Sequence, residues 1–164
     1  MRTAPLCYTR AMETPPQWPD ALRPPDVDHV ADLLQKFWLE LERLPAHLRA
    51  QELILAEALT AHLRHIIIEL MLAMNGIAWP EGTQHLNGYL GASQRAVLER
   101  TLAAADSSSD TWLARAVALV VIYRWYAPQC VERFDVAYPQ ATETRVWAAL
   151  CAQLPNWPTA LTTE

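Results

Sequence analysis

Apolar residues recur at helical spacing through most of the chain. Between residues 26 and 44 they follow one another at intervals of three and four: Val27, Val30, Leu33, Leu34, Phe37, Trp38, Leu41 and Leu44. This spacing places them on one stripe of an amphipathic helix, and Asp26 or Asp28 is a candidate N-cap after the preceding prolines. The pattern therefore predicts a helix over 26–44, which Pro45 ends.

The next apolar stripe is longer and widens along its length. It runs over 45–74, with Pro45 at the first turn and a continuous apolar run at Ile66 to Ile68. Asn75 and Gly76 then supply residues that tolerate the left-handed conformation of a helix stop. We expect this second helix to be the central element of the fold, because a broad apolar surface needs neighbours on several sides.

All four glycines of the chain lie in the connection that follows. Residues 76–91 predict an irregular loop with a short helix over 83–90. Ser93 is a candidate cap for a further helix that extends to Ala105.

A nearly all-apolar stretch dominates the C-terminal third. It predicts a buried helix over 111–138 that Asp110 caps and that Pro128 kinks or splits into two pieces. A final helix is expected over 142–153. The predicted fold class is all-α: an up-and-down helical bundle of about five helices.

The length of 164 residues suits a single domain. Six of the twelve prolines lie in residues 1–25, which we interpret as a proline-rich arm or linker. The helical bundle domain is then expected over 26–155, with a tail over 156–164.

The distribution of charge and the length of the apolar segments indicate which kinds of partner to expect. The net charge of −5 is spread along the chain, and no cluster of Lys and Arg is interleaved with aromatics, so we expect no nucleic-acid binding. No apolar run approaches the roughly 20 residues that a membrane-spanning helix needs, and no signal peptide is visible. The expected location is therefore the cytoplasm, without membrane association.

The three cysteines, Cys7, Cys130 and Cys151, form neither a C-x-x-C pair nor a metal-binding cluster. Free thiols in a reducing cytoplasm are the simplest interpretation. A disulfide between Cys130 and Cys151 remains an open alternative.

The sequence carries no phosphate-binding glycine loop, dinucleotide fingerprint, nucleophile elbow or H-E-x-x-H motif, so we predict no catalytic centre in this chain. His62, His65 and Glu69 are spaced so that they could share a helix face as a weak candidate metal site. The favoured interpretation is the polar edge of an amphipathic helix, and a metal-dependent hydrolase is disfavoured. A HEPN-like ribonuclease, whose class carries an Arg-x(4 to 6)-His motif, is also disfavoured, because Arg43 precedes His47 by too few residues and Arg49 precedes His62 by too many.

Most of the tryptophans fall on apolar stripes and are predicted to be core residues: Trp38, Trp112, Trp125 and Trp147. Trp79 and Trp157 lie beside prolines in predicted loops and have more freedom to touch a partner. Glu52 stands beside apolar residues, where a carboxylate is either a base next to a pocket or part of a solvated face paired with Arg49.

An ordered set of short motifs follows the proline-rich arm: Lys36-Phe37-Trp38, Leu48-Arg49-Ala50-Gln51-Glu52-Leu53, Asn75-Gly76-Ile77, Trp79-Pro80-Glu81-Gly82, His85-Leu86-Asn87-Gly88-Tyr89-Leu90 and Leu98-Glu99-Arg100-Thr101-Leu102. Over roughly residues 20–155 this order resembles the C-terminal helical, substrate-binding domain of aminoglycoside-nucleotidyltransferase-like proteins. In that family a separate α/β domain carries a Gly-Ser pair and an Asp-x-Asp site, and it transfers nucleotidyl groups with Mg²⁺ and a nucleoside triphosphate. The chain shows none of that catalytic core.

The resemblance implies a candidate ligand site formed by residues of these motifs: Arg49, Glu52, Trp79, His85 and Tyr89. It also implies that Mg²⁺ and nucleotide reach the protein only through a partner core. The chain departs from the family where Arg-Gly-Glu becomes Arg49-Ala-Gln-Glu52 and where a Lys becomes Gln84 or His85. A helical remnant, or one subunit of a split enzyme, therefore fits better than a complete transferase.

Two functions follow as expectations. The first is a non-catalytic helical domain that acts with a separate nucleotidyltransferase catalytic subunit or binds a small polar ligand. The alternative is a helical interaction protein, antitoxin-like or structural, that forms a homodimer through an apolar face.

Overall fold

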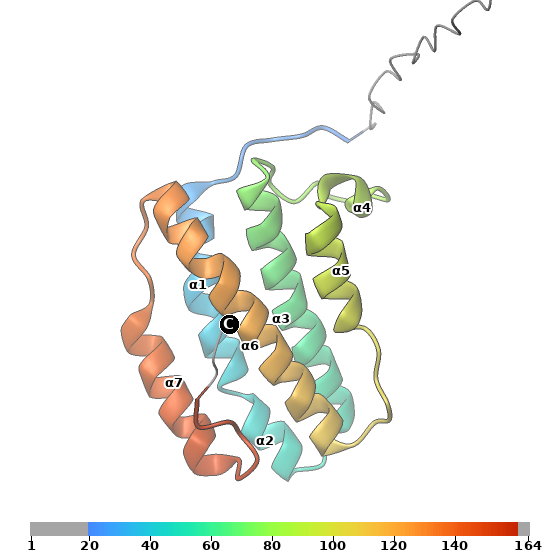
Figure 1. Ribbon diagram of the computed structural model, residues 1–164, viewed down its shortest axis with the longest axis vertical. Coiled ribbons are helices and arrows are strands. Elements are labelled where there is room, and N and C mark those ends of the chain that lie inside the picture. Colours follow the sequence, from blue (N-terminus) through green and yellow to red (C-terminus); the bar gives the residue numbers. More distant parts are fainter. Residues whose placement is uncertain (1–19, 161–164) are drawn as a thin grey trace, which may run out of the picture.

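The computed structural model describes residues 20–160, so the arm over 1–19 and the last four residues lie outside the described part. All regular secondary structure in residues 20–160 is helical (Figure 1): α1 (Val27–Leu41), α2 (Leu44–Arg49), α3 (Leu53–Met74), α4 (Leu86–Tyr89), α5 (Ala92–Arg100), α6 (Ser109–Phe134) and α7 (Gln140–Gln153). Five of these are long, and α2 and α4 are short. The prediction of an all-α bundle of about five helices is confirmed.

Helices α3 and α6 form the centre of the bundle and run in the same direction (Figure 1). Near their starts, Gln51 Nε2 donates to Ser109 Oγ at 3.2 Å. Near their ends, the Cys130 thiol lies 3.9 Å from the Leu70 carbonyl oxygen. The central position predicted for the second helix is confirmed, since α3 also contacts α1 and α2.

The apolar stripe of α1 faces the core as its spacing predicts. The Asp26 side chain caps the helix and accepts a hydrogen bond from the Asp28 amide at 2.9 Å. Inside the bundle, Phe37 stacks on Tyr123 with ring centroids 4.1 Å apart. The Tyr123 hydroxyl donates to the Leu34 carbonyl at 2.8 Å, and burial raises the pKa of this phenol well above its usual value.

The predicted second helix is divided in two, which corrects the continuous helix expected over 45–74. Gln51 adopts a left-handed backbone conformation with φ of 55° between α2 and α3. Its side-chain amide donates to the Leu48 carbonyl at 3.0 Å, which satisfies a group at the end of α2. The predicted stop after α3 is confirmed, because Gly76 has φ of 83°.

The boundaries of α5 differ from the prediction. The helix begins after Gly91 rather than at Ser93 and ends at Arg100 rather than at Ala105. The Gln94 side chain reaches back to accept the Gly91 amide at 2.8 Å, and this bond fixes the earlier start.

Helix α6 also departs from its predicted limits. Ser108, not Asp110, is the cap, with its hydroxyl oxygen accepting the Thr111 amide at 3.2 Å. The helix ends before Asp135, which has φ of 53°, rather than continuing to residue 138. Pro128 does not split it, because the buried residues on both sides of the proline hold the helix against α3.

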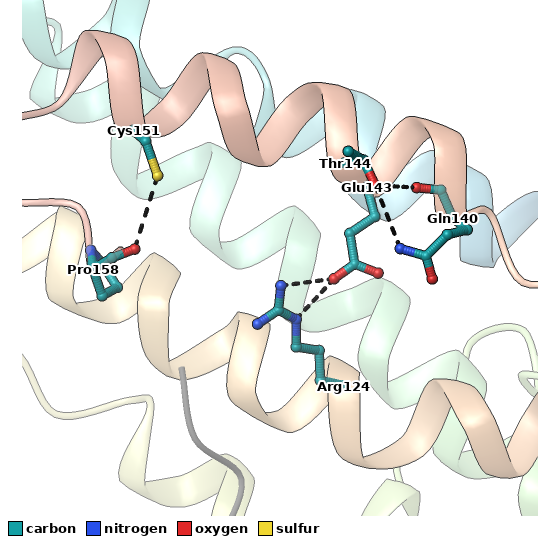
Figure 2. Close-up of polar contacts among 6 residues, drawn as sticks. All are labelled: Arg124, Gln140, Glu143, Thr144, Cys151 and Pro158. Carbon is teal, nitrogen blue, oxygen red and sulfur yellow. Dashed lines mark hydrogen bonds and ion pairs between the residues drawn. The ribbon is translucent and has the colours of Figure 1, made fainter. Parts of the chain in front are cut away.

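An ion pair joins α6 to α7 (Figure 2). Nε and Nη2 of Arg124 lie 2.9 and 2.7 Å from one oxygen of Glu143. The Arg124 guanidinium also lies over the Trp147 ring, 4.3 Å from its centroid. Together these contacts close one side of the bundle.

Two tryptophans do not lie where their sequence context predicts. Trp125 is 62 % exposed on α6, although it falls on an apolar stripe, because α6 turns this position away from α3. Trp157 is only 3 % exposed and contacts Trp147 edge-on at 5.6 Å, although it lies in a proline-flanked tail.

The disulfide that the sequence left open is not formed. Cys130 is buried, and burial raises the pKa of its thiol to about 12. Cys151 is half-buried, with its sulfur 4.0 Å from the Pro158 carbonyl oxygen (Figure 2). Both thiols are therefore free, and Cys7 lies outside the described residues.

Between residues 20 and 160, no helix combines the length and the apolar character needed to cross a membrane.

Candidate functional site

The residues that the sequence nominated fall at opposite ends of the bundle. Arg49 and Glu52 flank the turn between α2 and α3, whereas Trp79, His85 and Tyr89 lie in or near the connection that follows α3. The 22 residues of α3 separate the two groups by about 33 Å. The two groups therefore cannot line one small-molecule site.

The Arg49 side chain makes local surface contacts. Its Nη2 donates to Gln153 Oε1 at 3.0 Å, and its Nε donates to the Pro45 carbonyl at 3.3 Å. Glu52 is exposed at the N-cap position of α3, where its side chain makes no capping hydrogen bond. These contacts join α2 to the end of α7.

At the other end of the bundle, a carboxylate bridges two histidines. Glu69 on α3 lies 2.7 Å from Nε2 of His29 on α1 and 3.2 Å from Nε2 of His65 one turn earlier on α3. The imidazole of His65 stacks on the indole of Trp79 with centroids 4.2 Å apart. The structure thus brings His65, Glu69 and Trp79 together and adds His29.

Two hollows meet beside this cluster, and we call them together the Trp79 cleft. One has a volume of about 310 Å³, and its lining includes Asp26, His29 and Glu69. The second has a volume of about 240 Å³, and its lining includes Asp20 and Glu81. Trp79, Ala78 and Arg23 line both. The Ala78 amide donates to the Arg23 carbonyl at 2.8 Å, which ties the segment before α1 to the loop after α3.

Tyr89 holds a carboxylate at the edge of the cleft. Its hydroxyl and that of Thr83 each donate to Asp20 Oδ2 at 2.7 Å. These two hydrogen bonds lower the pKa of Asp20. Burial, together with the bond to the Asp20 carboxylate, raises the pKa of Tyr89 to about 12. Tyr89 therefore acts through Asp20, which lines the cleft.

His85 lies in the same loop, just before α4. Its backbone amide donates to Thr83 Oγ1 at 3.0 Å, and its half-buried ring lies close enough to Asp20 to lower the pKa of that carboxyl further. His85 thus contributes to the electrostatic field of the loop that carries Trp79.

His62 does not join the other two members of the proposed metal face. It lines a separate hollow of about 210 Å³ between α1, α2 and α3, together with His47, Glu40 and Arg43. Within residues 20–160, no group of three or more His, Cys, Asp or Glu side chains is arranged to hold a metal ion.

The charges around the Trp79 cleft are mostly negative. Four carboxylates line the two hollows: Asp20, Asp26, Glu69 and Glu81. One guanidinium, that of Arg23, faces them. An indole beside several carboxylates is a combination that attracts organic cations.

Sequence reasoning missed His29 and Arg23. Both precede or open α1, and they meet Glu69 and Trp79 only because α1 crosses the C-terminal half of α3. His29 is 40 positions from Glu69. No spacing within a single helix can signal such a pair.

In comparisons with known proteins, no family model, no curated protein and no solved structure matches this chain.

Proposed function

We propose that this chain is a cytoplasmic, non-catalytic helical domain, related to the substrate-binding domain of nucleotidyltransferases, that binds a small polar ligand in the Trp79 cleft. The observation that carries the proposal is an open cleft whose lining combines Trp79 with four carboxylates. The ligand class that fits is a compact molecule with several ammonium groups, because such a molecule brings positive charge to the carboxylates of the lining and can place a cation beside the indole.

A separate catalytic chain would complete the function. The support for this partner is the resemblance of the motif order to a helical domain that accompanies an α/β core. In the proposed complex, the partner supplies Mg²⁺, nucleotide and the Asp-x-Asp site, and this chain presents the amine-bearing substrate.

The direct test is calorimetry with three probes: kanamycin, spermidine and ATP with Mg²⁺. We expect both amines to bind and ATP with Mg²⁺ to give no heat, because the carboxylates of the cleft repel an anionic ligand. Trp79→Ala should weaken kanamycin binding by about tenfold, since it removes the aromatic face.

The matched control is Trp125→Ala, which removes an exposed tryptophan outside the cleft. This variant should bind kanamycin as the wild type does. Absence of heat with both amines at millimolar concentration, or equal loss of binding in the two variants, would overturn the ligand proposal.

The partner is tested by co-expression with the protein encoded in the adjacent reading frame. We expect a stable complex if that protein carries Gly-Ser and Asp-x-Asp, and nucleotidyl transfer to kanamycin only when both chains are present. If neighbouring gene products neither bind this chain nor gain activity from it, the partner role fails.

A further inference from the structure

Helix α3 carries an exposed ridge on the side that faces away from α6. Four residues at spacings of four, three and four form it: Ile54, Ala58, Ala61 and His65. Ile54 is 83 % exposed, Ala58 and His65 are exposed, and Ala61 is half-buried. Within residues 20–160 Ile54 is the most exposed large apolar residue, and Ala58 borders the hollow of about 210 Å³ between α1, α2 and α3.

We propose that the α3 ridge packs against the same ridge of a second copy of this chain, with the two α3 helices antiparallel. Spacings of four and three keep the ridge on one side of the helix, as in the seam of a two-stranded coiled coil. The two alanines lie at its centre, where small side chains let two helix backbones approach closely. The proposed interface goes beyond the ligand site and needs no ligand.

The ridge is self-complementary about a twofold axis that passes between Ala58 and Ala61. In an antiparallel pair with this axis, Ala58 of one copy faces Ala61 of the other, and Ile54 faces His65 of the other. His65 is already stacked on Trp79, so Ile54 of the second copy would cover the edge of an aromatic pair. The same contact forms twice, once at each end of the ridge.

The charges beside the ridge also match a second copy. Glu57 and Arg64 lie on the same flank of α3, seven residues apart, which is nearly two helical turns. A twofold axis between antiparallel helices places this flank against its own copy in reverse order, so that Glu57 faces Arg64 of the other chain. Glu57 is exposed and Arg64 is half-buried, with its Nε donating to Thr101 Oγ1 at 2.8 Å. Arg64 Nη2 also donates to the Thr101 carbonyl at 3.1 Å, so two nitrogens of the guanidinium are bonded to the end of α5, and Nη1 is the nitrogen that would meet Glu57 of the second copy.

The pairing of unlike charges favours a second copy over other occupants. Like-charged flanks would oppose self-association, whereas here both ends of the interface gain an attractive pair.

The first experiment is sedimentation analysis of the full chain over a range of concentrations. We expect a monomer–dimer equilibrium in the wild type. Ile54→Glu should raise the dimer dissociation constant at least about a hundredfold, because each interface loses two apolar contacts and gains two carboxylates. The circular dichroism spectrum and melting temperature should stay close to those of the wild type, because the side chain is exposed.

The matched control is Trp125→Glu, which changes an exposed apolar residue on α6. This variant should dimerise as the wild type does. A strictly monomeric wild type, or a dimer that Trp125→Glu dissociates and Ile54→Glu does not, would overturn the proposal.

Cysteine crosslinking tests the direction of the helices in a Cys7→Ser, Cys151→Ser background. Ala61→Cys should form a disulfide-linked dimer on oxidation, because the two copies of position 61 lie beside the axis. Ile54→Cys should not, because its two copies are separated by about 16 Å along the helices. Crosslinking at both positions would indicate parallel helices, in which each ridge residue faces its own copy, and would contradict the proposed arrangement; absence of crosslinking at position 61 would contradict it as well.

Discussion

Two regions of this protein use the same kinds of residue in opposite ways. Between α6 and α7, Glu143 pairs with Arg124, whose guanidinium lies over Trp147. In the Trp79 cleft, Glu69 contacts two histidines, and His65 stacks on Trp79. The first set is enclosed, with the side chains of Arg124 and Glu143 only 23 % and 11 % exposed. In the second set Glu69 is also enclosed, at 17 % exposed, but its two histidine partners are 57 % and 45 % exposed.

The two regions therefore differ in the exposure of the basic partner: the guanidinium of Arg124 is enclosed, whereas the imidazoles of His29 and His65 reach the surface. The enclosed pair has helices on several sides, so its contacts are made within the fold. The exposed cluster borders two hollows and keeps polar and aromatic surface that a ligand can reach. Substitutions in the two regions should therefore affect different measurements.

The largest effect is expected from Glu143→Ala. This change leaves the Arg124 guanidinium partly buried without its carboxylate and should lower the free energy of unfolding by about 3 kcal/mol. Urea denaturation followed by circular dichroism measures the loss. Glu143→Gln keeps a hydrogen-bond acceptor and should cost less; equal stability of Glu143→Ala and the wild type would show that the contact does not hold α7.

A smaller effect is expected from Tyr123→Phe on the same side of the bundle. The hydroxyl donates to the Leu34 carbonyl in the core, and its removal should cost about 1 kcal/mol. The stack on Phe37 remains, so the loss reports the hydrogen bond alone. Thermal unfolding provides the measurement, and a loss as large as that of Glu143→Ala would contradict the ranking.

In the Trp79 cleft, Glu69→Ala should change stability by only about 0.5 kcal/mol, because both histidines remain in contact with water. The same variant should weaken kanamycin binding in calorimetry, since it removes a carboxylate from the lining of the cleft. The comparison between the two regions would fail if this variant were as unstable as Glu143→Ala.

The smallest effect is expected from Asp20→Asn, which should change how far the melting temperature falls at acid pH. Hydrogen bonds from Tyr89 and Thr83 lower the pKa of Asp20 below its usual value of 3.8. The carboxylate therefore stabilises the fold above that pH, and the contribution disappears as the pH falls through the lowered pKa. Melting temperatures between about pH 6 and pH 2.5 should fall less in Asp20→Asn than in the wild type. Parallel curves would indicate that Asp20 gains nothing from these bonds on folding.

Residue spacing and backbone preferences predicted the helices correctly where no long-range contact altered the local structure. The stripe of α1 and its Asp26 cap, the left-handed Gly76 and the all-α class follow from spacing and backbone preferences. It was less reliable where a long-range contact decided the outcome. Gln51 divides the second helix while its side chain bonds Ser109 at the start of α6, and Pro128 stays inside α6 because α3 supports the helix there.

In the candidate site, too, some features follow from neighbouring residues and others only from the tertiary structure. The sequence by itself determined that Trp79 lies in a loop after the central helix and that His65 and Glu69 share a helix face, because both are properties of neighbouring residues. Only the tertiary structure decided that His29 and Arg23 join them, that Arg49 and Glu52 lie at the far end of α3, and that Ile54 of the α3 ridge is exposed. These outcomes depend on how the helices cross, and helix crossing follows from the summed packing of the whole core rather than from the order of residues at any one position.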